Sequence, residues 1–396
     1  MFTNAPGVDG LWRGCRPHAA PGTGRRGIPP VQFSGWDGPD RRDRSGPTRR
    51  LACVAGAIGV ASARQTRLDR LPCCPQSRDW EFTINRPTKH DHHTVPRFYL
   101  NRFANGTKQV IRTTVPDGPS KLVSTKSTTV VKDFYMVETA DGTMTDEIEE
   151  SLSRVENAAA PAISSLVDGS AWPIPPETRE AVSAWAAMQY LRTPAARQVS
   201  SEIADMSLKL EIAVKGWDGM REALEAVEGR TVSEAEVDEA WELMTDFDDY
   251  TLDPHQNDHI FTMDRLFRGT AWQFYGRSWN LIHFQRESLV TTDTPVVLMK
   301  PLGQNSQLPI GTATAGGVLV ALDRRVGLIM TNDQLGDIQI RGDAPLASSL
   351  NQRIVQEARC HIFHHPDDNP LKGLSLPPHR EREVEFTDPR QFLPEE

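Results

Sequence analysis

Hydrophobic residues recur at helical spacing through the middle of the chain. Between residues 145 and 167 the apolar positions are three or four residues apart, at Ile148, Leu152, Val155, Ala159, Ile163 and Leu166. This spacing puts them on one helix face and predicts a helix over 145–167 with Thr145 as its N-cap. Similar patterns predict further helices over 177–191, 195–215, 233–245 and 256–274. The helix over 233–245 opens with Ser233-Glu234-Ala235-Glu236, a capping box.

Shorter apolar and β-branched runs flank these helices and predict strands. The predicted strands are 108–115, 278–284, 289–299, 317–323 and 326–331, and a closing amphipathic helix is predicted over 345–363. Strands, a run of helices, and strands again are typical of an α+β fold rather than of alternating βαβ units. We therefore expect a central helical layer, about 145–275, packed on a small mixed or antiparallel sheet whose strands lie at about 278–331.

The first eighty residues differ from the rest of the chain. They hold 13 Arg, 6 Asp, no Lys and no Glu, and they are rich in Gly and Pro without apolar periodicity. Such a segment cannot bury enough apolar surface to fold, so we expect either a disordered leader or a misplaced translation start. Residues 49–63 resemble a signal peptide, although they lie about fifty residues too late. We expect residues 81–396 to form a single domain.

The body has the composition of a globular protein. The formal charge is −9 in total and +7 over the first eighty residues, which leaves −16 for the body and argues against a broad nucleic-acid-binding face. No apolar run is long enough to span a membrane. Cys360 is the single body cysteine, which fits a cytoplasmic protein without disulfides. Composition identifies no other partner.

The first segment with candidate chemistry runs from Lys89 to Phe103. His92 and His93 are candidate metal ligands or acid–base groups, and an extended backbone would turn only one of them toward a given site. Lys89 and Tyr99 are candidate substrate-binding residues. The alternative is a polar loop before a helix that is anchored in the core by Phe98, Tyr99 and Phe103.

Two further segments carry polar side chains that packing does not require. Gln189 and Arg192 stand at a predicted helix end, where Arg192 either complements the helix dipole or holds a carboxylate or phosphate. Asp293, at the end of a buried strand, is either a metal ligand or base, or a turn former before Thr294-Pro295.

The closing helix contributes Asn351 as a substrate-binding candidate. His361 and His365 would share a face if this helix continued, although a helix end before Pro366 explains them equally well. The body has no phosphate-binding Gly-rich loop, no Gly-x-Ser-x-Gly elbow and no Cys-x-x-Cys. The Gly22–Gly27 motif precedes Pro29-Pro30 rather than a helix, so it does not indicate dinucleotide binding.

These segments, in this order, resemble the bacterial family called domain of unknown function 4238. The resemblance covers about residues 88–365 and rests first on His92-His93-x-x-Pro96-x-x-Tyr99-Leu100-x-x-Phe103. The other matching motifs are Lys132-Asp133-Phe134-Tyr135, Ile148-Glu149, Arg192-Thr193-Pro194, Trp279, Thr292-Asp293-Thr294-Pro295 and Asn351. The family's Pro-Leu pair before its last helix is matched only loosely, at 320–325. The resemblance implies one shared pocket but no reaction.

Two hypotheses follow, and they leave open whether the chain is an enzyme. The first is a hydrolase acting on a phosphodiester or nucleotide, in which His92, His93 and Asp293 bind a divalent metal or act as acid and base. In this hypothesis Arg192 holds an anionic group and Asn351 orients substrate or water. The second is a non-enzymatic sensor or interaction domain, in which the His-His and Arg-Thr-Pro segments are structural and mutually hydrogen-bonded.

Overall fold

The computed structural model describes residues 89–139, 142–252, 254–301, 303, 310–384 and 386–393. The expected leader over 1–80 and the signal-like residues 49–63 lie outside this description. Long helices and several sheets both occur, so the predicted α+β class is confirmed. None of the helices in the described residues is both long enough and apolar enough to cross a membrane.

The described residues group into two compact units. One contains 205–251 and 386–393, and the other contains the described parts of 89–204 and 252–385. All candidate residues named above belong to the second unit. That 81–396 folds as one domain stays a prediction.

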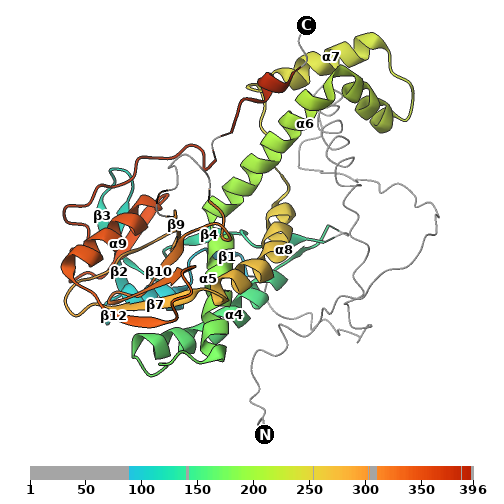
Figure 1. The fold of residues 1–396 in the computed structure, drawn as a ribbon. Helices are drawn as coiled ribbons and strands as arrows, with labels where there is room; N and C mark the ends of the chain where they lie inside the picture. The colour runs from blue at the N-terminus through green and yellow to red at the C-terminus, as the bar shows by residue number, and fades with distance from the viewer. Residues whose placement is uncertain are drawn as a thin grey trace, which may run out of the picture. The chain divides into compact units, whose positions relative to one another are not determined.

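The helical layer of the second unit is built around α5 (Pro176–Leu191). It packs between α4 (Glu147–Val167) and α8 (Gln256–Tyr275), as Figure 1 shows. Because α5 is covered on both sides, most of its residues are buried, including Val182, Trp185 and Met188. The three helices were predicted within a few residues.

The start of α4 differs from the prediction. Its N-cap is Asp146 rather than Thr145. Thr145 instead belongs to β6 (Met144–Thr145), which pairs antiparallel with β5 (Val137–Glu138). The backbone of Thr145 is therefore extended by strand pairing, and the helix begins after it.

The remaining helices also match their patterns. α6 (Pro194–Glu228) takes a non-helical conformation at Gly216, with φ of 64°, next to the predicted end at 215, and the chain then resumes a helix. α7 (Glu234–Thr245) has the predicted capping box between Ser233 and Glu236. Glycine adopts a positive φ at little cost, so Gly216 allows the interruption.

Two larger sheets complete the second unit. The five-stranded sheet has the order β12-β7-β11-β10-β9 and is antiparallel except between β12 and β7, so it is mixed, as predicted. Its strands are β7 (Ser278–His283), β9 (Val296–Met299), β10 (Gly317–Asp323), β11 (Val326–Thr331) and β12 (Ile338–Arg341).

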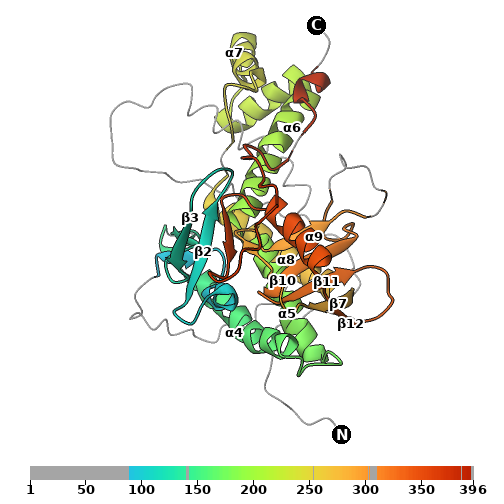
Figure 2. The same ribbon diagram turned by 90° about the vertical axis from the view of Figure 1, so that its left-hand side faces the viewer.

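The four-stranded sheet has the order β3-β2-β13-β8. Its strands are β2 (Gln109–Thr114), β3 (Ser120–Ser124), β8 (Thr291–Thr292) and β13 (His361–His364). Figure 2 separates the β2–β3 hairpin from strands β7, β10, β11 and β12 of the larger sheet. A short pair, β1 (Asp91–His93) and β4 (Val130–Lys132), carries the two predicted site histidines.

Two predicted elements were wrong in extent. The strand predicted over 289–299 is divided into β8 and β9, which belong to different sheets, because the turn before Pro295 redirects the chain. The helix predicted over 345–363 is α9 (Ala344–Gln356) followed by β13. His361 and His365 consequently do not share a helix face, since His361 is in a strand and pairs with Thr114.

Tyr99 joins the helical layer to the sheets. It lies in α3 (Arg97–Leu100), followed by the 3-10 helix η1 (Asn101–Phe103), and it is fully buried. Its ring centroid lies 5.0 Å from that of Trp185 on α5 and 5.4 Å from that of Phe103. The motif's aromatic residues are therefore core anchors.

His259 is a buried histidine of α8 that packs edge-on against Phe134, with ring centroids 6.1 Å apart. Neither ring nitrogen has a hydrogen-bond partner. Burial, and secondarily the positive charge of Arg197, lowers the pKa of His259 from 6.5 to about 4. The folded state therefore holds this imidazole neutral, while the unfolded chain takes up a proton as the pH falls below 6.5.

This histidine should make the fold acid-sensitive. Stability should be lost as the pH falls from 6.5 toward 4, by up to about 3 kcal/mol, because the unfolded state binds the proton first. Urea unfolding of His259→Leu at pH 7.5 and pH 4.5 should show a smaller loss than the wild type. His379→Leu, at an exposed position, is the matched control, and an equal loss in all three proteins would contradict the assignment.

Candidate functional site

The pairing of β1 with β4 sends the two adjacent histidines in opposite directions. His92 opposes Val131 and His93 opposes Val130. His92 is completely buried, whereas His93 is partly exposed. Successive strand residues point to opposite faces, so the two imidazoles have different roles.

His92 is the buried histidine, and its contacts are with Tyr135. Its Nδ1 accepts a hydrogen bond from the backbone N–H of Tyr135 at 2.9 Å, and the two rings are 5.5 Å apart. The Tyr135 hydroxyl in turn donates to the carbonyl of Arg192 at 2.9 Å. Burial lowers the pKa of His92, which keeps the imidazole neutral and able to accept.

Gln189 and Arg192, at the C-terminal end of α5, make the next set of hydrogen bonds. The Gln189 amide nitrogen donates to the carbonyl of Thr94 at 2.9 Å, and its amide oxygen accepts from Arg192 Nε at 3.0 Å. The Arg192 guanidinium, only 1% exposed, also donates from Nη1 to Glu156 Oε1 at 2.7 Å. Its Nη2 is buried without a hydrogen-bond partner. Arg192 thus joins α4, α5 and the histidine motif.

His93 is the partly exposed histidine of the motif. Its Nε2 donates to the carbonyl of Lys126 at 3.1 Å, which leaves Nδ1 as the basic nitrogen of the neutral ring. Burial is the largest influence on its pKa and lowers it. The charge of Glu156 raises this pKa and that of Arg192 lowers it.

Glu149 is the second titratable group beside the ion pair. It lies seven residues before Glu156 on α4, so both carboxylates share one helix face. Burial raises the pKa of Glu149, against the effect of Lys89, whose Nζ lies 4.0 Å from Oε1. The Glu149 side chain retains 19% exposure and that of Glu156 26%. We call Lys89, His93, Glu149, Glu156 and Arg192 the His93 cluster.

The structure places Asp293 in a different setting. Its carboxylate accepts backbone N–H bonds from Arg359, Cys360 and His361, at 3.0, 2.7 and 3.2 Å. Burial raises the pKa of Asp293, while these three N–H groups oppose the rise. Asp293 therefore holds the turn between α9 and β13 through its hydrogen bonds.

Asn351 and Tyr99 hold the segment that precedes Asp293. Asn351 accepts from the N–H of Val290 at 3.0 Å and donates to the carbonyl of Ser288 at 2.8 Å. The Tyr99 hydroxyl donates to the carbonyl of Ala321 at 2.7 Å and accepts from the Thr291 hydroxyl at 2.8 Å. Both side chains are therefore hydrogen-bonded to the fold itself.

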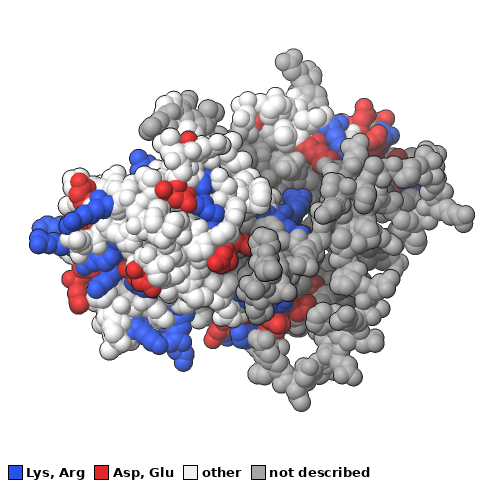
Figure 3. Space-filling view, turned by 60° about the horizontal axis from the view of Figure 1, so that its bottom comes forward, with Lys and Arg blue, Asp and Glu red and all other residues white. Residues whose placement is uncertain are grey.

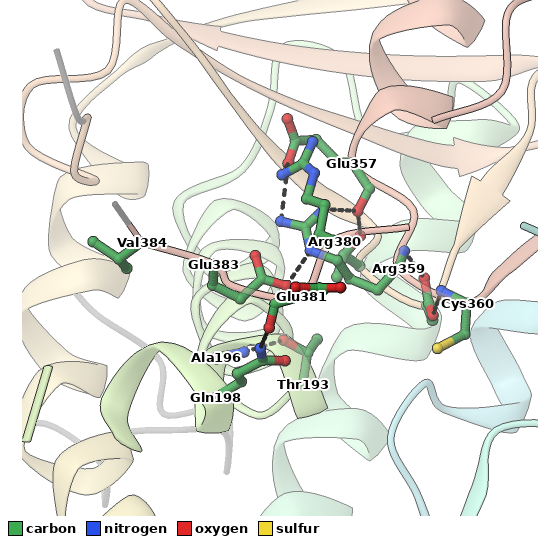
Figure 4. Close-up of polar contacts among 12 residues, drawn as sticks. Thr193, Ala196, Gln198, Glu357, Arg359, Cys360, Arg380, Glu381, Glu383 and Val384 are labelled. Atoms are coloured by element: carbon green, nitrogen blue, oxygen red, sulfur yellow. Dashed lines mark hydrogen bonds and ion pairs between the residues drawn. The ribbon is translucent and has the colours of Figure 1, made fainter. Parts of the chain in front are cut away.

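Residues 374–384, which we call the C-terminal strap, bind to α9 and to the first turns of α6. Figure 4 shows the contacts of the last part of the strap. Arg359 pairs with Glu383, and Gln198 donates to the carbonyl of Glu381 at 3.0 Å. The Glu202 carboxylate accepts from the N–H groups of Glu383 and Val384.

The candidate residues therefore form two groups. His92 and Arg192 are linked through Tyr135, Gln189 and Glu156 bind Arg192, Lys89 contacts Glu149, and His93 contacts Lys126. Asn351 binds the backbone of residues 288 and 290, Tyr99 binds Thr291 and Ala321, and Asp293 binds the backbone of 359–361. Among the described residues, no three His, Cys, Asp or Glu side chains are arranged to hold a metal ion. That His92, His93 and Asp293 bind a metal stays a prediction. On the face in Figure 3, acidic and basic side chains are interspersed.

A family model described as a protein of unknown function, DUF4238, matches residues 91–368. The chain belongs to this family. The DUF4238 match includes every residue of the His93 cluster except Lys89, and it confirms the resemblance inferred from the His-His motif. No curated protein and no solved structure matches the chain.

Sequence reasoning missed Glu156 and gave Glu149 no chemical role. Glu149 was part of the Ile-Glu pair that supported the DUF4238 resemblance, and Glu156 lies two turns further along the same helix. The available signal was a pair of carboxylates on the edge of an apolar helix face. Their partner, Arg192, lies 36 residues away in the sequence.

Replacing Asn351 should destabilise the fold strongly. Asn351→Ala leaves a buried backbone N–H and a buried carbonyl without partners, a loss of about 2–4 kcal/mol in the free energy of unfolding. Urea denaturation measures it, with Arg353→Ala, at an exposed position on the same helix, as control. A loss below about 0.5 kcal/mol would be inconsistent with the hydrogen bonds described.

Proposed function

We propose that this DUF4238 protein is a hydrolase that uses the His93 cluster for acid–base catalysis. The carrying observation is that the pKa of the His93 imidazole is lowered and that of the Glu149 carboxyl is raised, both mainly by burial, and that the charges of Arg192 and Glu156 act on both groups, while His93 Nε2 is held by the Lys126 carbonyl. Environments that move the pKa values of two neighbouring groups away from their usual ranges favour acid and base roles.

In the proposed reaction His93 is the general base and Glu149 the general acid. Nδ1 of His93 takes a proton from water as the water oxygen attacks the electrophilic centre. The bond to the leaving oxygen breaks, and that oxygen receives a proton from Glu149. Proton exchange with solvent returns both groups to their starting states. Lys126, through its carbonyl, orients the imidazole as the third member of this arrangement.

The charges around His93 favour an anionic substrate. Arg192 and Lys89 belong to the cluster, and Arg97 is close enough to lower the pKa of His93. Arg192 contributes its positive charge from the buried side, since its guanidinium is only 1% exposed, whereas the Lys89 ammonium is accessible to a phosphate or carboxylate oxygen. These features support a phosphodiester or nucleotide substrate. A divalent metal is not required by this assignment, since the bases and acids named are side chains.

A non-catalytic interaction domain is the second candidate. It is favoured by the backbone-directed hydrogen bonds of His92, Gln189, Asp293 and Asn351, which stabilise the fold. In that case the DUF4238 motif would specify architecture, and His93 would be a partly exposed member of it without a reaction of its own.

Activity should depend on His93 more than stability does. With bis(p-nitrophenyl) phosphate as probe, His93→Ala should lower kcat/KM by about 10²–10⁴-fold, because the general base is lost. Glu149→Gln should lower it as well. Activity should fall as the pH drops through the pKa of His93, which lies below 6.5. Steady-state kinetics between pH 4.5 and 9 measure both effects.

His90→Ala is the matched control, since His90 is an exposed histidine three residues away that contacts Asp133. It should retain wild-type kinetics. If wild-type protein hydrolyses neither this probe nor a mixed set of nucleotides and oligonucleotides, with or without added divalent metals, the hydrolase is refuted. The interaction domain is then the better assignment.

A further inference from the structure

Strand β4, which pairs with the histidine strand β1, is bordered at each end by a residue in the left-handed backbone conformation. Thr129, just before β4, has a φ of 61°, and Asp133, just after it, has a φ of 55°. In the described part of the chain, only four residues other than glycine have a positive φ. Aspartate tolerates this conformation, whereas it is rare for a β-branched residue. Thr129 is therefore the unusual residue of the pair.

Three hydrogen bonds hold Thr129 in this conformation. Its hydroxyl donates to the carbonyl of Val95 at 3.0 Å. Its carbonyl accepts from the N–H of Thr94 at 2.9 Å and from the Thr94 hydroxyl at 3.2 Å. A sparsely populated backbone conformation persists only where its surroundings over-determine it, and such residues cluster at functional sites. Thr94 and Val95 directly follow His93, so Thr129 is bound to the histidine motif itself.

The turn that Thr129 completes carries the hydrogen-bond acceptor of His93. At the start of this turn the buried Thr125 donates from its hydroxyl to Asn101 Oδ1 at 2.7 Å. Lys126 follows, and its carbonyl accepts from His93 Nε2 at 3.1 Å. The position of this carbonyl therefore depends on an anchor at Thr125 and on the direction in which the chain leaves the turn at Thr129.

We propose that Thr129 is a positioning residue for His93: its left-handed backbone directs the Lys126 carbonyl at Nε2 and so fixes the imidazole in the tautomer whose Nδ1 accepts a proton. A carbonyl oxygen can only accept, so Nε2 carries the hydrogen in this geometry. With a negative φ at Thr129 the chain would leave the turn in another direction, and the Lys126 carbonyl would no longer face the imidazole. The inference rests on the proposed function, in which His93 is the base.

The other influences on His93 come from different elements than the turn. Burial lowers the pKa of His93 most strongly, and the hydrogen bond to the Lys126 carbonyl raises it. Glu156 on α4 raises the pKa as well, while Arg192 at the end of α5 and Arg97 on α3 lower it. Loss of the Lys126 hydrogen bond alone should therefore move the pKa of His93 further down.

Tautomer-sensitive ¹⁵N NMR of His93 in the full chain at pH 7.5 tests this inference without substrate. The wild type should carry the ring hydrogen on Nε2. Thr129→Val keeps the side-chain shape but loses the hydroxyl that supports the positive φ, so this signature should be lost and the pKa of His93 should fall. With bis(p-nitrophenyl) phosphate, kcat should drop about tenfold or more at little change in KM. Thr129→Gly should keep the signature, because glycine adopts a positive φ at little cost.

Gln334→Val is the matched control, since Gln334 also has a positive φ, of 54°, and is exposed outside the His93 cluster. It should leave the tautomer and kcat unchanged. If circular dichroism shows Thr129→Val unfolded, Thr129→Ala, which also lacks the hydroxyl, replaces it. An unchanged Nε2–H signature in the folded variant, loss of the signature in Thr129→Gly, or a wild type with the hydrogen on Nδ1 would overturn the inference. Loss of the signature in Thr129→Val together with an inactive wild type would keep Thr129 as the residue that positions His93 and refute only the proposed function.

Discussion

The buried ion pair between Arg192 and Glu156 is the interaction on which the architecture of the site depends. A guanidinium that is 1% exposed is costly unless its charge and donors are matched. Here Glu156 on α4 supplies the charge and Gln189 on α5 supplies a further acceptor. The Arg192 backbone also accepts from Tyr135, which binds His92. One side chain thereby fixes two helices and the histidine strand in register.

This connectivity explains why the family motif contains both buried and accessible polar residues. His92, Gln189 and Tyr135 are held in place by hydrogen bonds to the backbone. His93 and Glu149 retain contact with solvent. The supporting residues keep the imidazole and the carboxyl in fixed environments, which is what a perturbed pKa requires. The buried and the partly exposed imidazole are therefore adjacent residues of one short strand.

Local patterns predicted most elements, because helical periodicity and turn residues act over a few positions. The capping box of α7 and the apolar face of α4 are examples. The division of 289–299 between two sheets was not predictable in this way, since it depends on pairing with β10 and β13, which follow later in the chain. Likewise, His361 lies in a strand because it pairs with Thr114 of β2, 247 residues earlier in the chain. In the site, His93 and Arg192 were recognised by residue type, but Glu156 required knowledge of which helix faces Arg192.

The C-terminal strap is attached largely through its own backbone. Gln352 and Gln356, one turn apart on α9, both bind the backbone of Ser375, and Glu202 binds two consecutive backbone N–H groups near its end. Such contacts depend on the backbone conformation of the bound segment rather than on its side chains. The strap begins after the last residue matched by the family model, 368. Its attachment therefore depends on the backbone path of the strap together with two side chains, Glu383, which pairs with Arg359, and Arg380, which donates to the carbonyl of Gln356, so substitutions at the other strap positions leave these attachments in place.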